Sequence, residues 1–263
     1  MNYYKATVQY DGTNYYGFQW QKDIPTIQKE INLSLNQLLG GQISTVGASR
    51  TDKGVHALEQ IVKITSQHQI EHNSFMAALN KTLPPEVRCL SIEPCDGSFN
   101  PITSSASKEY RYLFTNTLMS GGLEQRFIAN YPYNLNLELM QKCAREIVGR
   151  HDFRNFCSAG SNVKTTIRTV LDCEITTIDP HIVLPSGDLF SLSPELKQCY
   201  QLRIEGEGFL KQMVRHLMSA LWLVGRGKIS HEEFSLLLSG RPKDGRLWKV
   251  ATPRGLYLYR FKA

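Results

Sequence analysis

The chain has 263 residues, of which 41% are hydrophobic and 21% charged, and this composition excludes a disordered or fibrous protein while allowing one large or two small cores. Its 30 Lys and Arg against 24 Asp and Glu give a net charge of +6, a mild excess that is compatible with a polyanionic partner without requiring one. The six cysteines are dispersed and form no C-x-x-C pair, which argues against a zinc ribbon and a disulfide framework.

Two further patterns concern the location of the protein. No apolar run approaches the roughly 18 residues of a membrane-spanning helix, and the first residues lack the charged-then-apolar pattern of a signal peptide. We therefore expect a cytoplasmic protein that has no association with a membrane.

The first elements of the chain are a strand and an aromatic loop. Alternating apolar and polar residues from Tyr4 to Tyr10 predict a half-buried strand. The loop that follows, residues 11–21, mixes four aromatic residues with amides and glycines. Such rings either fill gaps in a core or stack on unpaired RNA bases, and the residues leave both uses open.

The next predicted elements are two helices and three strands. A helix with one apolar face is expected from Ile27 to Leu38, with Thr26 as its N-cap and Gly40 as its end. Further patterns predict strands over 43–48, 61–65 and 87–93, and a helix over 74–83 that ends before Pro84. The order of strand, helix, strand, strand, helix, strand is that of a ferredoxin-like unit.

A polar turn lies between the strands predicted at 43–48 and 61–65. It brings a base, an acid and an imidazole within seven residues, namely Arg50, Asp52 and His56. Catalytic and binding side chains often lie in loops at such strand ends. Residues 52–54 also fit an ordinary hairpin turn, because Asp and Gly tolerate the positive φ angles that such turns need. The residues alone are equally compatible with a turn Asp and a catalytic Asp.

The second part of the chain begins after a segment over 95–107 that is rich in Ser, Asn, Gly and Pro. We place the boundary between two halves there, giving residues 1–104 and 105–263. The second half is predicted to contain strands over 108–114, 170–177, 200–205 and 255–259, and helices over 137–148, 209–224 and 231–238. Residues 178–198 form an excursion whose function the sequence does not indicate. His151 and Asp152 could form a catalytic pair or a structural turn, and we favour the turn.

Six segments resemble, in order, motifs of the TruA family of tRNA pseudouridine synthases. Residues 49–56, Ser-Arg-Thr-Asp-Lys-Gly-Val-His, resemble the family signature Gly-Arg-Thr-Asp-Ala-Gly-Val-His. Residues 10–21 resemble the opening Tyr-Asp-Gly-Thr-x-Tyr-x-Gly-Phe-Gln-x-Gln. The other four are Tyr-Arg-Tyr at 110–112, His-Asp-Phe at 151–153, Phe-x-x-x-Met-Val-Arg at 209–215 and Gly-Leu-Tyr-Leu at 255–258. The chain departs from the family at Ser49, Lys53 and Ile102, where Gly, Ala and Arg are usual.

The resemblance implies roles for individual residues. It makes Asp52 the catalytic nucleophile, pairs Arg215 with it, and lets Tyr110 contact the target base. Substrate binding is assigned to Tyr110, Arg50, Leu256 and His56. No cofactor and no metal are implied, and no residue cluster in the sequence has metal-ligand spacing.

The resemblance also implies a fold and an activity. The fold is α/β (α+β), with two similar ferredoxin-like halves around an extended, mainly antiparallel sheet, helices on one face and a central RNA-binding cleft. The activity is isomerisation of uridine to pseudouridine at positions 38, 39 and 40 of the tRNA anticodon arm, by a homodimer without other protein partners.

Two alternatives stay open beside this function. One is a related synthase for other tRNA or RNA uridines, and the other is a noncatalytic RNA-binding module of the same fold. The joint presence of Asp52, Tyr110 and Arg215 argues against the module, because binding alone has no need of a buried carboxylate with its counter-ion.

Basic side chains near the predicted cleft are candidates for holding tRNA. They are Arg50, Lys53, Lys108, Arg111, Lys211 and Arg254. Lys53 is the informative one, because it stands where the family usually has Ala. It either contacts a phosphate or is a solvated turn residue, and the sequence favours neither.

Overall fold

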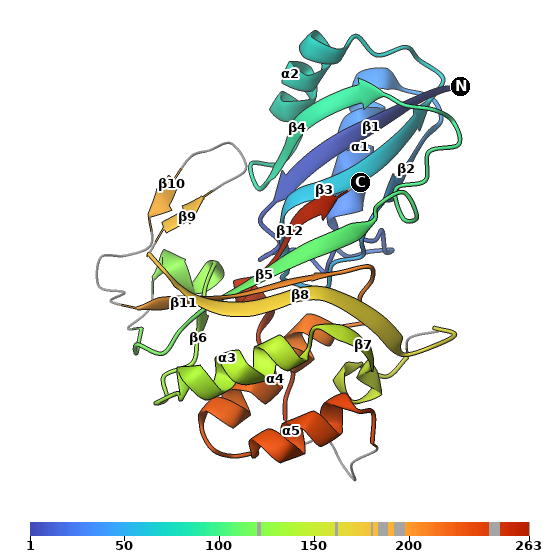
Figure 1. Ribbon diagram of the computed structural model, residues 1–263. Helices are drawn as coiled ribbons and strands as arrows, with labels where there is room; N and C mark the ends of the chain where they lie inside the picture. The colour runs from blue at the N-terminus through green and yellow to red at the C-terminus, as the bar shows by residue number, and fades with distance from the viewer. Residues whose placement is uncertain are drawn as a thin grey trace. The chain divides into compact units, whose positions relative to one another are not determined.

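The computed structural model describes residues 1–119, 122–160, 163–179, 181–183, 189–191, 198–241 and 248–262, and its contacts divide the chain into two compact units (Figure 1). Unit 1 comprises Met1–Ala106 and Tyr257–Ala263, and unit 2 comprises Ser107–Leu256. The division at 1–104 and 105–263 that we expected differs from this one in the last segment. The reason is a strand pairing: Tyr257 and Leu258 pair in parallel with His56 and Ala57.

Unit 1 has the strand and helix order that the sequence predicts. Its elements are β1 (Asn2–Tyr10), α1 (Ile27–Leu39), β2 (Ile43–Gly47), β3 (His56–Ser66), α2 (His72–Thr82), β4 (Val87–Pro94) and β12 (Leu256–Lys262). β1 pairs antiparallel with β3 and β4, and β2 pairs antiparallel with β3. The resulting order β4-β1-β3-β2 confirms a ferredoxin-like unit, with β12 added in parallel beside the start of β3.

The predicted half-buried strand and packing helix of unit 1 are confirmed. Tyr4, Ala6, Val8 and Tyr10 of β1 are buried, and their neighbours along the strand are half-buried. Thr26 occupies the N-cap position of α1, but its side chain makes no cap hydrogen bond.

The aromatic loop caps α1 in place of the Thr26 side chain. The amides of Ile27 and Gln28, the first two of the helix, donate to the carbonyls of Gly17 (3.2 Å) and Phe18 (2.9 Å). Two of the orphan donors at the helix N-terminus are thus satisfied by backbone rather than by a hydroxyl. The loop over 11–21 is thereby fixed to the helix that follows it.

Unit 2 also has helices packed on one side of an antiparallel sheet (Figure 1). Its larger elements are β5 (Ser107–Thr115), β6 (Ala129–Asn130), α3 (Leu137–Glu146), β7 (Gly149–Asp152), β8 (Ile167–Ile178), β11 (Cys199–Gly206), α4 (Met213–Gly225) and α5 (His231–Leu238). Short 3₁₀ helices cover Leu123–Arg126, Phe153–Phe156 and Pro253–Gly255, and β9 (His181–Val183) and β10 (Leu189–Ser191) form a small hairpin. The four longer strands of unit 2 follow the order β5-β11-β8-β7, with β6 paired to β5.

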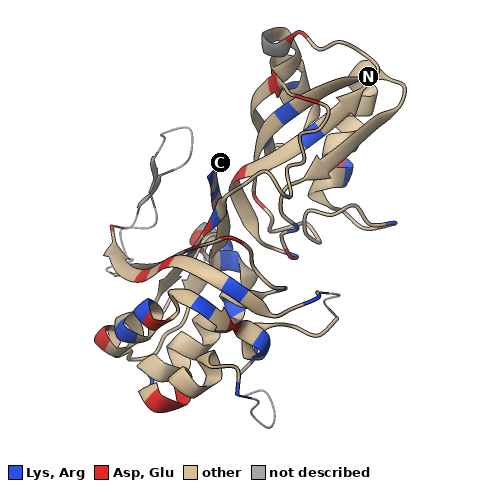
Figure 2. Cartoon of the chain, turned by 45° about the vertical axis from the view of Figure 1, so that its right-hand side comes forward, with Lys and Arg blue, Asp and Glu red and all other residues tan. Residues whose placement is uncertain are grey.

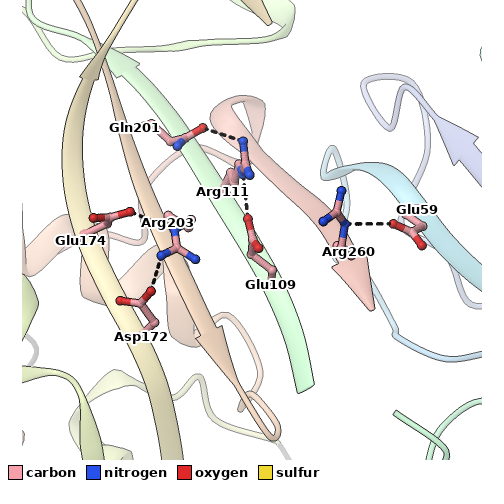
Figure 3. A network of polar contacts seen from close by, with 8 residues as sticks. All are labelled: Glu59, Glu109, Arg111, Asp172, Glu174, Gln201, Arg203 and Arg260. Atoms are coloured by element: carbon pink, nitrogen blue, oxygen red, sulfur yellow. Dashed lines mark hydrogen bonds and ion pairs between the residues drawn. The ribbon is translucent and has the colours of Figure 1, made fainter. Parts of the chain in front are cut away.

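The two faces of the unit 2 sheet differ in chemistry. On the helix side, the rings of Tyr112 and Phe114 pack edge-on against Trp222 of α4, with centroids 5.7 and 5.8 Å apart. On the other side lie ion pairs, among them Arg111 to Glu109 (2.8 Å) and Arg203 to Glu174 (2.9 Å), with Asp172 also bonded to Arg203 (Figure 3). Successive side chains of a strand point to opposite faces of the sheet, which separates the aromatic rings from the ion pairs.

One prediction for unit 2 is modified by the structure. The helix expected over 209–224 begins only at Met213, because Gln212 adopts a left-handed conformation with φ of 61° and interrupts helical geometry. Much of the excursion over 178–198 lies outside the described residues. Within the described part of the chain, no helix has the length and hydrophobicity needed to cross a bilayer.

Gly12 provides a test of the packing beneath the 51–55 turn. A Cβ at Gly12 would lie 1.9 Å from the Val55 carbonyl oxygen, so Gly12→Ala forces backbone to move and we expect it to cost about 1–3 kcal/mol in the free energy of unfolding. Gly208→Ala is the control, since its Cβ would meet atoms no nearer than 3.9 Å. Urea unfolding of both variants measures the difference, and an unchanged midpoint for Gly12→Ala would contradict the packing.

Candidate active site

Asp52 lies in a tight turn between β2 and β3. The Val55 amide donates to the Asp52 carbonyl over 3.1 Å, and Gly54 has φ of 76°. A glycine with positive φ at the third turn position is the pattern of a type II turn. A turn at residues 52–54 is therefore confirmed, but it lies within a longer connection than a hairpin turn, because the pairing of β2 with β3 ends at Gly47 and Val62. The Asp52 side chain is half-buried.

The aromatic loop holds this turn from one side. The Phe18 amide donates to the Thr51 carbonyl and the Gly54 amide donates to the Tyr15 carbonyl, each over 3.1 Å. Gly17 brings the two backbones together, because a Cβ there would lie 2.5 Å from the Thr51 carbonyl oxygen. The residues on both sides of Asp52 thus have fixed backbone positions.

The four rings of the loop differ in their exposure to solvent. Tyr15 and Phe18 are buried, and Phe18 packs so closely on Gly47 that a Cβ there would lie 2.2 Å from the ring. Tyr16 and Trp20 are 44% and 50% exposed. Two rings therefore build the core under the turn, and two are presented to solvent beside it.

Polar side chains of the strands hold the turn from the other side. The buried Gln60 side chain accepts from the Ser49 amide (3.2 Å) and donates to the Ser49 carbonyl (2.7 Å). The Tyr10 hydroxyl is 2.8 Å from the Thr51 hydroxyl. Ser49, one of the departures from the family, is therefore held through its backbone.

His56 is a support of the site rather than an exposed group. Its side chain is 1% exposed, stacks on the Tyr257 ring at a centroid distance of 4.8 Å, and has Nδ1 3.1 Å from Asp11 Oδ1. The Gly12 amide also lies 3.2 Å from Nδ1. The contact with the Gly12 amide requires an Nδ1 without a proton, whereas the contact with the Asp11 carboxylate requires a protonated Nδ1. Donation from Nδ1 to the carboxylate is the stronger of the two because it is charge-assisted.

Arg50 and Lys53 flank Asp52 and are both exposed. The Lys53 ammonium lies 3.6 Å from the centroid of the Tyr16 ring, a cation–π contact of about 0.5–1 kcal/mol at such an exposed site. Lys53 thus contacts an aromatic ring, and among the described residues it forms no ion pair.

In unit 2, the buried Arg215 lies in the first turn of α4. Its Nε donates to the Ala251 carbonyl over 2.7 Å, and the Ser219 hydroxyl of the next turn donates to the Arg215 carbonyl over 3.0 Å. A guanidinium that is 8% exposed requires partners to offset its loss of hydration. The side chain is therefore directed by the protein rather than by solvent.

A chain of hydrogen bonds beside Arg215 has no signature in the sequence. Trp248 Nε1–H donates to His216 Nδ1 over 3.2 Å, which leaves the proton of neutral His216 on Nε2, facing the Ser158 hydroxyl at 2.9 Å. That hydroxyl donates to the Gln212 side chain. With Nε2 protonated, His216 cannot act as a base on Ser158, so the chain supports the strained start of α4 and is no nucleophilic dyad.

Tyr110 and Leu256 are both buried, at 8% and 5% exposure. The Tyr110 ring, on β5, meets the Phe209 ring edge-on with centroids 5.0 Å apart. Leu256 is the first residue of β12, directly after the 3₁₀ turn Pro253–Gly255. Tyr110 thus has an aromatic neighbour in unit 2, and Leu256 is buried at the start of its strand.

The His151 and Asp152 pair has a structural explanation. The Asp152 carboxylate accepts from the Arg154 amide and so caps the 3₁₀ helix Phe153–Phe156, and it also accepts from the Thr166 hydroxyl. His151 Nε2 contacts the Val148 carbonyl at 3.2 Å. These contacts favour the turn over a catalytic pair. Over the described ranges, no group of three His, Cys, Asp or Glu residues is placed to hold a metal ion.

The Asp11 to His56 contact has a consequence for stability against acid. Burial raises the pKa of the Asp11 carboxyl, but hydrogen bonds from His56 and Thr13 outweigh it and hold the pKa well below its ordinary value of 3.8. A carboxyl with a depressed folded-state pKa stabilises the fold above its unfolded pKa and loses that contribution as the pH falls.

We therefore expect Asp11→Asn to lower the melting temperature at pH 7, with the gap to the parent narrowing below about pH 4. Asp23→Asn, in an exposed loop position, is the control and should track the parent throughout. Melting curves from pH 7 to pH 3 measure both. A gap that stays constant or widens in acid would show that the Asp11 charge is not what stabilises the turn.

Comparison with known proteins gives one consistent result. The profile of a family described as tRNA pseudouridine synthase matches residues 6–100 and 143–262. The chain is 32% identical over 261 residues to tRNA pseudouridine synthase A of Listeria monocytogenes, covering 99% of this chain and 98% of the relative. It is 34% identical over 254 residues to the protein of that name from Acetivibrio thermocellus, covering 97% and 96%.

A third relative, tRNA pseudouridine synthase A of Pseudothermotoga lettingae, is 32% identical over 259 residues, which are 98% of each chain. The similarity therefore includes the Asp52 turn, the aromatic loop, β5, α4 and β12 together. This chain belongs to the TruA family of tRNA pseudouridine synthases.

Proposed function

We propose that this enzyme isomerises uridine to pseudouridine at positions 38, 39 and 40 of the tRNA anticodon arm, with Asp52 as its nucleophile. The observation that carries the proposal is the backbone clamp on the Asp52 turn, in which residues on both sides of Asp52 are fixed while its side chain is half-buried. Fixed geometry of this kind is what a reacting group needs.

The reaction fits a single carboxylate. The N1–C1′ bond of the uridine breaks, the retained uracil turns, a C5–C1′ bond forms, the proton leaves C5 and one is gained at N1, so nothing is oxidised, reduced or hydrolysed. A carboxylate can form a covalent intermediate or stabilise an oxocarbenium-like sugar, as in glycoside chemistry. The chemistry calls for no redox cofactor.

Arg215 is proposed as the counter-ion of the reacting carboxylate. A carboxylate in a site that excludes water needs a positive partner to stay ionised, and a guanidinium keeps its charge under all physiological conditions. The support for this role is that Arg215 is buried and oriented by the Ala251 carbonyl, which no solvated helix arginine would need.

The remaining roles concern the target nucleotide. We propose that Tyr110 covers the uracil while it turns, that Leu256 lines the uracil pocket, and that Arg50 supports a nucleotide flipped out of the stack. For His56, its burial against Asp11 and Tyr257 favours positioning of the turn over direct contact with RNA. We propose the enzyme as a cytoplasmic homodimer, as the family resemblance implies.

The first test of this function is the substitution Asp52→Asn. The amide preserves shape and removes the nucleophile, so we expect the variant to bind an unmodified tRNA transcript like the parent and to form no pseudouridine in a single turnover. Asp96→Asn, at an exposed carboxylate of the same unit, should keep the parental rate. Product formation by Asp52→Asn above about 1% of the parental rate would remove Asp52 from its role.

The second test separates charge from packing at Arg215. Arg215→Met should lower the single-turnover rate about 100-fold or more, and Arg215→Lys, which keeps the charge without the planar fork, should recover part of it. Arg226→Met is the control, at the opposite end of the same helix. If Arg215→Met folds and reacts within about threefold of the parent, Arg215 has no electrostatic part in the reaction.

A further inference from the structure

Lys53 and Tyr16 form a pair at two positions that the family motifs do not fix. Lys53 stands where Ala is usual, and Tyr16 occupies an unspecified position of the Tyr-Asp-Gly-Thr-x-Tyr-x-Gly opening. In the structure the ammonium of one lies 3.6 Å from the ring centroid of the other. The pair thus joins the Asp52 turn to the aromatic loop through two side chains that the motifs do not specify.

The pair is not needed to hold the two loops together. They are already joined by the hydrogen bonds from Phe18 to Thr51 and from Gly54 to Tyr15, and by the close backbone approach at Gly17. An exposed cation–π contact adds little to such a clamp. The contact matters more for the lysine, because a ring beneath the ammonium restricts a long and otherwise mobile side chain.

The ring itself is well placed to do this. The Tyr16 amide donates to the Pro25 carbonyl over 2.9 Å, and its carbonyl accepts from the Gln21 side chain at 3.2 Å. Its neighbour Gly17 is packed against Thr51. The tyrosine backbone is therefore fixed at both ends, so the ring offers the ammonium a defined position.

The ammonium also keeps its capacity for an anion. Lys53 is exposed, and in the described part of the chain no carboxylate lies within ion-pair distance of it. A cation held on a ring face can still donate hydrogen bonds on its other side. Lys and Arg are scattered over both units rather than gathered on one element (Figure 2), so binding of a polyanion has to rest on individual residues such as this one.

We propose that Lys53, held over the Tyr16 ring, binds a phosphate of the tRNA strand next to the target nucleotide. Lys53 directly follows Asp52, and consecutive Cα atoms are about 3.8 Å apart, so any strand that delivers a nucleotide to Asp52 brings its own backbone near this ammonium. The proposal rests on the proposed function for the identity of the polyanion. It adds a contact that an Ala at this position cannot make.

The test is tRNA binding at several salt concentrations in the Asp52→Asn background, which prevents turnover. Removing one phosphate contact flattens the slope of log affinity against log salt by about 0.7 to 0.9. Between 50 and 200 mM salt the parent background should therefore lose about threefold more affinity than Lys53→Ala loses. Lys81→Ala, at an exposed lysine in the last turn of α2, is the matched control and should leave the slope unchanged.

The variant Tyr16→Leu tests the role of the ring. This variant keeps the Lys53 charge, so the salt slope should equal that of the parent background while the affinity for tRNA weakens. The double variant Lys53→Ala with Tyr16→Leu should bind tRNA no more weakly than Lys53→Ala alone. Additive losses in the double variant would mean that the ring contacts RNA independently, which overturns the pair as proposed. A Lys53→Ala slope equal to that of Lys81→Ala also overturns it, including when the variant is less stable, because a purely structural contact alters stability without altering the slope.

The failure of this proposal is distinguishable from failure of the proposed function. Pseudouridine formation by the parent on the same transcript reports on the function alone. A slope that responds to Lys53→Ala without any pseudouridine formation would leave the phosphate contact standing and remove the synthase activity. Pseudouridine formation with an unresponsive slope would do the reverse.

Discussion

The Asp52 turn is held by backbone hydrogen bonds from the aromatic loop, and the rest of the candidate site depends on this contact. Phe18 and Gly54 supply the two bonds, and Gly12 and Gly17 allow the backbones to approach where any Cβ would collide. The same loop caps the first helix of its unit through the carbonyls of Gly17 and Phe18. One loop thus couples the position of the Asp52 turn to the packing of the first helix of its unit.

Much of the fold could be predicted from the sequence, because the periodic elements are also the buried ones. The alternation in β1, the apolar face of α1 and the Ser230-capped α5 each follow from local pattern and capping chemistry. The parallel pairing of β12 with β3 could not be predicted, since it joins residues 201 positions apart, such as Tyr257 and His56, and has no local signal. The early start expected for α4 was wrong for a similar reason: the apolar spacing of Phe209 is helical, and only the left-handed Gln212 reveals the turn.

The motifs predict Asp52, Arg215 and Tyr110 as site residues, and their roles stay predictions. The residues that support the candidate site were harder to predict. The contacts of Gln60 and His216 join residues 11 and 58 positions apart, and no motif marks these two supports. Asp11 lies in the opening motif, but its contact with His56 has no local signal in the sequence. The choice between core and exposed rings in the aromatic loop also depended on tertiary packing, which buries Tyr15 and exposes its neighbour Tyr16.

The central claim is that a carboxylate fixed in this turn isomerises anticodon-arm uridines, and pseudouridine mapping in tRNA tests it most directly. The measurement compares cells that lack the protein, cells that regain it and cells that receive the Asp52→Asn form. The account predicts unmodified uridine at positions 38, 39 and 40 in the first and third, and pseudouridine in the second. Pseudouridine at those positions in cells that lack the protein, or its full restoration by Asp52→Asn, would contradict the account.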